Sequence, residues 1–211
     1  MLKYEKLVLG ELETNCYIVW DDETKEGVII DPADAATEIS DEVQRLQLKL
    51  LVILATHGHF DHLLAAMDLK LMYNIPIGVS VKDMFLLKRQ KETAEHFLRH
   101  RVDTLDIPET EVDLSNAKNI LLGDEKLRVI KTPGHTPGGV CFFDSRQKLL
   151  FTGDTLFAEG GVGSTDHKYS SMSDLRKSLR NLLELPPETT VLPGHGETDT
   201  ISNSLSLLGS L

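Results

Sequence analysis

Residues 50–62, with the sequence LLVILATHGHFDH, decide how the rest of this chain is interpreted. The first six residues are all apolar, and an apolar run of that length is typical of a fully buried strand. His57, His59, Asp61 and His62 then follow within six residues. Open α/β sheets place their chemistry at the carboxyl ends of strands, so we expect these side chains to converge there on a metal ion.

The composition is that of a chain that folds around a hydrophobic core. Hydrophobic residues make up 41% of the 211, and we expect one domain over residues 1–211. The two cysteines, Cys16 and Cys141, are too few for a disulfide framework, so we predict buried thiols in a reducing compartment. The N-terminus lacks a signal-peptide pattern and no later segment approaches membrane-span length, which predicts a cytoplasmic protein.

The formal net charge of -11 restricts the class of partner. Sequence-independent binding to nucleic acid, or binding to an anionic membrane, needs a basic surface, so we expect neither partner. A small-molecule substrate is expected instead, and the oligomeric state is left open.

Hydrophobic patterning predicts alternating strands and helices along the chain. Strands are expected at 2–9, 15–20, 27–30, 50–55, 127–130, 148–151 and 190–192, with a further candidate at 75–81 that Pro76 interrupts. Helices are expected at 34–48, after His62, over the charged stretch 82–101 and at 173–185. The last three strands each run into a glycine-flanked loop with one metal-competent side chain, which is His135, Asp154 or His195.

Seven side chains in these strand-end loops are therefore candidate metal ligands: His57, His59, Asp61, His62, His135, Asp154 and His195. One tetrahedral zinc takes four ligands, so seven favour two divalent ions that share a carboxylate. Histidines two residues apart in an extended loop project to the same side. We assign His57, His59 and His135 to one ion and Asp61, His62 and His195 to the other, with Asp154 as the bridge. Imidazole and carboxylate ligands suit zinc, iron or manganese, and zinc is the first expectation.

The ligand set predicts hydrolytic chemistry. Cations beside a water lower its pKa, toward about 7 for a single zinc site. The resulting metal-bound hydroxide is expected to attack a carbonyl carbon while a metal polarises the oxygen. Asp61 and Asp154, with that hydroxide, are the predicted catalytic groups. A purely structural zinc site is disfavoured, because such sites are closed and four-coordinate.

The order and spacing of these motifs resemble the metallo-β-lactamase superfamily. The similarity rests on THGHFDH at 56–62 followed by His135, Asp154 and His195, and it spans almost the whole chain. It implies an α/β fold, a four-layer αββα sandwich with a dinuclear site at one edge of its two sheets. The sequences TPGHTPG at 132–138 and FTGDTLF at 151–157 are most similar to the hydroxyacylglutathione hydrolase, or glyoxalase II, group in its compact branch. This similarity implies thioester hydrolysis.

The substrate side departs from that group. Its members usually carry an arginine in the loop after the bridging aspartate, where this chain has Ser164, and the residues after His195 include no basic one. A glutathione carboxylate binds best to Arg or Lys, so another thioester or ester is a candidate substrate. Ser164, His167, Lys168 and Tyr169 are the candidate substrate-binding residues, with Lys168 as the first candidate to replace the arginine.

Other functions remain open at this point. A mononuclear iron persulfide dioxygenase resembles this pattern, and a promiscuous lactonase, β-lactamase or ribonuclease of the same fold would use the same centre. The acidic charge disfavours the ribonuclease. His96 and His100, four apart in the 82–101 stretch, are expected on a solvated helix face, and the stretch itself is a candidate cover for the mouth of the site.

Overall fold

Two six-stranded sheets form the centre of the computed structural model, which describes residues 1–206. The first sheet follows chain order: β1 (Leu2–Leu9), β2 (Thr14–Asp21), β3 (Glu26–Ile30), β4 (Lys49–Leu54), β5 (Ile77–Val79) and β6 (Val112–Asp113). The second sheet has the order β12 (Asp199–Thr200), β11 (Thr190–Pro193), β10 (Leu149–Gly153), β9 (Val140–Asp144), β8 (Glu125–Lys131) and β7 (Asn119–Leu122). Strands β3 to β6 are parallel, as are β10 and β11, and the other neighbouring pairs are antiparallel.

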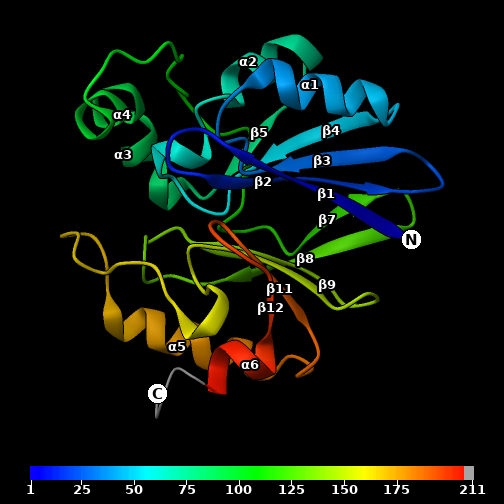
Figure 1. Cartoon of the computed structure of the whole chain (residues 1–211), viewed down its shortest axis with the longest axis vertical. Coiled ribbons are helices and arrows are strands. Elements are labelled where there is room, and N and C mark those ends of the chain that lie inside the picture. Colours follow the sequence, from blue (N-terminus) through cyan, green and yellow to red (C-terminus); the bar gives the residue numbers. More distant parts are fainter. Residues whose placement is uncertain (207–211) are drawn as a thin grey trace.

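Helices cover the outer faces of both sheets (Figure 1). The helices α1 (Ala36–Arg45) and α2 (Ala66–Tyr73) lie over the first sheet, and α5 (Met172–Leu182) and α6 (Ile201–Ser206) lie over the second. The layer order is therefore αββα, which confirms the predicted fold class. Two short helices, α3 (Met84–Leu87) and α4 (Gln90–Leu98), and three 3-10 turns, η1 (Phe60–His62), η2 (Val81–Asp83) and η3 (Ala158–Gly160), complete the elements. Within residues 1–206, every helix is too short or too polar to cross a bilayer.

Alternation along the strands divides apolar side chains between the layers. In β2, Ile18 and Trp20 pack in the cluster that includes Ile39 of α1, whereas Tyr17 and Val19 pack in the core between the two sheets. A half-exposed strand would have presented one of these faces to water. Because both faces of these strands are buried, their sequences are nearly continuous runs of apolar residues.

The second sheet follows the same rule. In β9, Cys141 and Phe143 pack with Leu175 and Leu179 of α5, whereas Phe142 faces the first sheet. Cys141 and Cys16 are both free and buried, which confirms the prediction of buried thiols.

The strands that precede the candidate ligands end at one edge of the sandwich. The strands β3 and β4 are parallel, and β8, β10 and β11 point in one direction because β9 runs against both β8 and β10. Backbone hydrogen bonds join the two sheets at this edge. The N–H of Asn15 donates to the carbonyl of Gly194 (2.7 Å), and the N–H of Val140 donates to that of Thr56 (2.8 Å). The connection holds loops from both halves of the chain against each other.

Some elements differ from the sequence-based expectation. The 82–101 stretch is broken into η2, α3 and α4 rather than forming one helix, and the break between α3 and α4 lies at Arg89, whose φ of -126° and ψ of 17° are not helical. The strand expected at 75–81 is limited to Ile77–Val79, after Pro76. The short strands β6, β7 and β12, and the fully buried β9, were not distinguished by their patterns. His96 and His100 are exposed, and His100 pairs with Glu11.

Candidate metal centre

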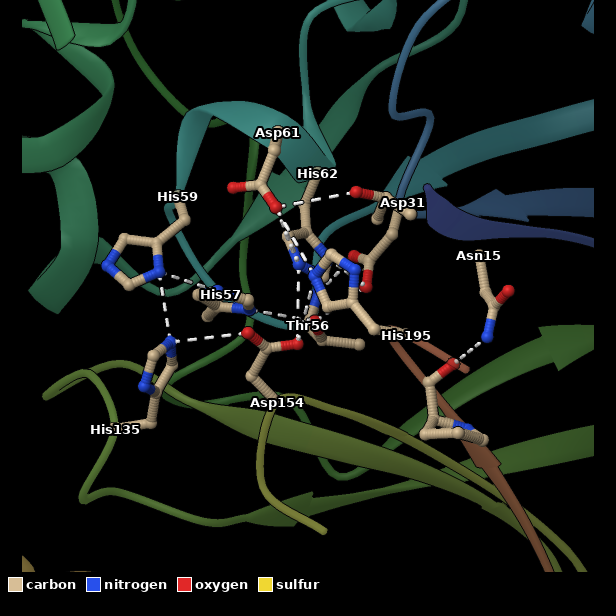
Figure 2. Close-up of polar contacts among 12 residues, drawn as sticks. Asn15, Asp31, Thr56, His57, His59, Asp61, His62, His135, Asp154 and His195 are labelled. Carbon is tan, nitrogen blue, oxygen red and sulfur yellow. Dashed lines mark hydrogen bonds and ion pairs between the residues drawn. The ribbon is translucent and has the colours of Figure 1, made fainter. Parts of the chain in front are cut away.

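Four strand-end loops supply the seven predicted ligands. His57, His59, Asp61 and His62 lie in the loop after β4 and in the turn η1. The loops after β8, β10 and β11 carry one ligand each, which are His135, Asp154 and His195. The structure brings all seven together at the shared edge (Figure 2).

The side chains form two groups, and within each group one ligand atom from every residue lies within 4.8 Å of the others. The first group contains His57, His59, His135 and Asp154, and the second contains Asp61, His62 and His195. The sequence predicts the same division between two ions. Metal binding by these two groups is a prediction.

Asp154 lies between the two groups. Its Oδ2 is 3.5 Å from Nε2 of His135, in the first group. Its Oδ1 is 3.4 Å from Nε2 of His62 and 3.7 Å from Nε2 of His195, in the second. Each carboxylate oxygen therefore faces a different group, as Figure 2 shows.

The spacing of the ligand atoms fits a pair of cations. Asp61 Oδ2 lies 3.5 Å from Nε2 of His62 and 3.3 Å from Nε2 of His195. Atoms held ~2.0–2.1 Å from a tetrahedral zinc are ~3.3 Å apart. His62 Nε2 and Asp154 Oδ1 are also buried without a hydrogen-bond partner in the described part of the chain. Such atoms are costly unless another group satisfies them, and a cation between them would do so.

Outer hydrogen bonds orient three of the imidazoles through Nδ1. These contacts run from His62 to Asp31 Oδ2 (2.9 Å), from His135 to the carbonyl of Ser164 (2.7 Å) and from His195 to the carbonyl of Leu12 (3.0 Å). Carbonyl and carboxylate oxygens only accept, so Nδ1 carries the proton in each ring. In the neutral ring, the lone pair of Nε2 then faces the centre, which is the tautomer that a metal requires.

The other two imidazoles are oriented by hydroxyl groups. The Thr56 hydroxyl donates to Asp31 Oδ2 (2.7 Å) and can therefore accept from Nδ1 of His57 (3.1 Å). His59 is turned the other way, with Nε2 2.8 Å from the Tyr169 hydroxyl and Nδ1 toward the centre. This Nδ1 lies 3.0 Å from Nε2 of His57, so both rings offer a lone pair to the same point.

The family model of the metallo-beta-lactamase superfamily matches this sequence over residues 9–195. The chain belongs to this superfamily. Hydroxyacylglutathione hydrolase GloC of Haemophilus influenzae is 35% identical over 202 residues, which cover 95% of this chain and 93% of that protein. A protein of Bacillus velezensis named "Probable polyketide biosynthesis zinc-dependent hydrolase BaeB" is 33% identical over 181 residues, 85% of this chain and 72% of that protein.

Two solved structures have the same fold as this chain along their whole length. The crystal structure of BLEG-1 B3 metallo-beta-lactamase superposes with a TM-score of 0.89 at 30% identity, covering 99% of this chain and 100% of that one. TTHA1623 in a di-iron-bound form superposes with a TM-score of 0.85 at 31% identity, covering 98% and 100%. These similarities establish a metallo-hydrolase family.

Electrostatics in this metallo-beta-lactamase superfamily member favour a cation. Burial, reinforced by neighbouring histidines, lowers the pKa of His57 well below its ordinary value and that of His59 to about 3, so both rings are neutral and free to bind. Burial also lowers the pKa of His62, but Asp61, Asp31 and Asp154 outweigh it and raise that pKa well above its usual range. Carboxylates gathered around one buried ring need positive charge beside them.

Two buried carboxylates support the centre although the sequence patterns do not single them out. Asp31 Oδ1 accepts from the backbone N–H of Thr56 (2.7 Å), while its Oδ2 contacts both the Thr56 hydroxyl and His62. It thereby links a histidine of each group. Its place directly after β3, the strand parallel to β4, is the signal that could have identified it.

Asp83, in the 82–101 stretch, is the second of these carboxylates. Its Oδ2 accepts from the N–H of Gly58 (3.0 Å) and the hydroxyl of Thr136 (2.7 Å), and its Oδ1 accepts from the N–H of Gly138 (2.7 Å). Asp83 therefore ties the loop of His57 and His59 to the loop of His135. A single aspartate in a charged run carries no local signal of such burial.

The candidate substrate residues fall into two sets. Tyr169 contacts His59, and the ring of His167 stacks on that of Tyr169 with centroids 5.0 Å apart; both line a cavity beside the centre. Ser164 directs its hydroxyl to Asp166 (2.9 Å), and Lys168 is exposed; neither lines that cavity. The backbone carbonyl of Ser164, rather than its side chain, contacts the centre through His135. Substrate binding by any of the four stays a prediction.

Proposed function

We propose that this protein is a dinuclear metal-dependent hydrolase of thioesters. The observation that carries the proposal is Asp154, whose two carboxylate oxygens face two complete groups of ligands. Two complete groups support two ions and are more than a mononuclear iron centre needs. The relative named hydroxyacylglutathione hydrolase supports a thioester, since a hydroxyacylglutathione is one.

The proposed metal is zinc. Five imidazoles and two carboxylates suit it, and the relative named as a zinc-dependent hydrolase supports it. Iron is the alternative, supported by the di-iron form of TTHA1623. When bound, such ions supply an acidified water and polarise a carbonyl oxygen.

The protein's own residues hold and orient these groups. His57, His59 and His135 would hold one ion, and Asp61, His62 and His195 the other, with Asp154 shared. Asp31 and Thr56 fix rings in both groups, so the two positions are held relative to each other. In the reaction, the oxygen of water adds to the thioester carbon, the C–S bond breaks, and the sulfur leaves as a thiol beside a carboxylic acid.

A single domain over residues 1–211 and a cytoplasmic location are parts of the same proposal. Side chains from both sheets pack in one core between them, which supports the single domain. The net charge of -11 supports a small-molecule substrate rather than nucleic acid.

Metal analysis combined with turnover tests the proposal. Protein produced in defined medium should contain about two metal ions per chain and hydrolyse thioesters, for example S-lactoylglutathione or an acyl thioester of N-acetylcysteamine. The Asp154→Ala variant should lose at least one ion and at least about 100-fold in kcat/KM, because both groups lose a ligand. Asp174→Ala, which removes an exposed carboxylate paired with Lys177, is the matched control.

Full turnover by Asp154→Ala would contradict the assigned roles. One iron per chain with oxygen consumption on glutathione persulfide would instead identify a dioxygenase.

A further inference from the structure

A cavity of ≈ 190 Å³ opens beside the metal centre. His59, Asp61 and His135 line it on the side of the centre. Its opposite wall comes from the segment of α3 and α4, through Leu86, Gln90, Thr93 and Phe97, and from Leu12 in the turn between β1 and β2. Any group held in this cavity would lie directly next to the ligands.

The wall is uncharged and mostly apolar, with Gln90 and Thr93 as its polar side chains. Leu12, Leu86 and Phe97 present hydrocarbon surface, and Gln90 is buried with its Nε2 donating to the carbonyl of Leu63 (3.0 Å). None of the residues that line the cavity is a lysine or an arginine. The arginine adjacent to Gln90, Arg89, is exposed and makes two hydrogen bonds to Glu92.

Large apolar side chains are exposed around the rim. Phe97 is 58% exposed, Leu12 45% and Phe85 43%. The two phenylalanines are held in place by aromatic contacts, since Phe97 stacks on Phe60 (5.9 Å between centroids) and Phe85 packs edge-on against Tyr169 (5.2 Å). Exposed apolar surface gathered at a hollow marks a binding site for an apolar group.

We propose that this cavity binds an apolar, uncharged arm of the substrate, so that the preferred substrates are acyl thioesters of neutral thiols rather than glutathione thioesters. The inference rests on the thioesterase function proposed above. Glutathione carries two carboxylates, which proteins bind through Arg or Lys, and this wall has neither. The net charge of -11 also slows the approach of an anion. The cavity is smaller than the roughly 300–1,000 Å³ of whole-ligand pockets, which suits one arm of a thioester.

A substrate series with the zinc-loaded full chain tests this inference. The series comprises acetyl, butyryl and hexanoyl thioesters of N-acetylcysteamine, with S-lactoylglutathione for comparison. Each methylene that enters the cavity should raise kcat/KM by up to about fourfold. The hexanoyl thioester should be hydrolysed more efficiently than S-lactoylglutathione. A flat series, or a preference for S-lactoylglutathione, would overturn the inference and leave the thioesterase function standing.

Failure of the proposed function has a different signature, because no thioester would then be hydrolysed. The cavity is still testable by calorimetry with two non-hydrolysable thioethers, S-hexyl-N-acetylcysteamine and S-hexylglutathione. The neutral thioether should bind at least as tightly as the anionic one. Tenfold tighter binding of S-hexylglutathione would refute an uncharged site.

Two substitutions link the selectivity to the wall. Phe97→Ala should lower kcat/KM for the hexanoyl thioester about tenfold and change the acetyl thioester less than about twofold, because only the longer chain reaches the ring. Leu121→Ala, at an exposed leucine of β7, is the matched control and should change neither. Thr93→Arg places a cation in the wall and should shift the ratio of S-lactoylglutathione to hexanoyl turnover at least tenfold toward the former. Equal losses on both acyl chains in Phe97→Ala, or an unchanged ratio in Thr93→Arg, would contradict the assignment.

Discussion

Replacing Asp83 by alanine should weaken both folding and metal binding, although Asp83 is not one of the seven ligands. Its carboxylate is buried and accepts hydrogen bonds from Gly58, Thr136 and Gly138. In Asp83→Ala, the two backbone N–H groups of Gly58 and Gly138 lose their acceptors. Each buried donor left unsatisfied costs about 1–3 kcal/mol, so the expected loss of unfolding free energy is about 2–6 kcal/mol. The Thr136 hydroxyl can rotate to another partner and is left out of this sum.

A loss of this size is a large fraction of the roughly 5–15 kcal/mol that stabilises a typical domain. Asp83→Asn is therefore the second variant, because it should stay folded where Asp83→Ala loses too much stability. Its amide oxygen can keep the contacts to Gly58 and Thr136, while its NH2 group faces the N–H of Gly138, so about one hydrogen bond is lost, at about 1–3 kcal/mol. Metal affinity should fall most in Asp83→Ala, where the loops of His57 and His135 are no longer tied together, and less in Asp83→Asn, which keeps the contacts to Gly58 and Thr136.

Urea unfolding of metal-free protein and zinc content per chain measure the two effects. Asp174→Ala, at an exposed carboxylate paired with Lys177, is the matched control and should cost at most about 1 kcal/mol. Equal unfolding free energies for Asp83→Ala and Asp174→Ala would refute the assigned role. Unchanged zinc content in folded Asp83→Ala would show that the tie between the loops is not needed for metal binding.

Three further predictions follow from the centre. Gly194→Ala should reduce metal content, because its added Cβ would lie 2.5 Å from Asp154 Oδ1 and 2.7 Å from Cε1 of His62. Gly196→Ala is the control, because its Cβ would meet no atom within 4 Å. This control should lower the free energy of unfolding through the positive φ of Gly196 but retain more metal than Gly194→Ala. Tyr169→Phe should weaken metal binding about 10- to 100-fold by removing the hydroxyl next to His59, as measured by competition with a chelating dye, and unchanged affinity would exclude this support. Zinc at 100 times its Kd should add about 2.7 kcal/mol per ion to the free energy of unfolding, which raises Tm by roughly 5–11 °C in calorimetry. The same shift in Asp154→Ala would show that the zinc binds elsewhere.

The sequence by itself determined which side chains meet and at which end of the strands. Apolar runs before 56–62 and before Asp154 and His195 predict buried strands, and the carboxyl ends of such strands share an edge. Ligand chemistry and spacing then predict two groups with Asp154 between them. These properties are local, because each depends on the residue type and on its distance from a strand end.

Only the tertiary structure decided which residues support the candidate ligands and which form the apolar wall of the cavity beside them. Asp83 meets Thr136, 53 residues away, and Asp31 meets His62, 31 residues away. The cavity wall combines Leu12 with Phe97, and the charged 82–101 stretch supplies its apolar part through residues that face inward once the stretch breaks into short helices. A buried carboxylate or an apolar wall depends on which distant segments exclude water around it. Local periodicity carries no information about those distant segments. The sequence therefore predicts the candidate metal ligands and, in His167 and Tyr169, two residues that line the cavity, but not the apolar wall opposite them.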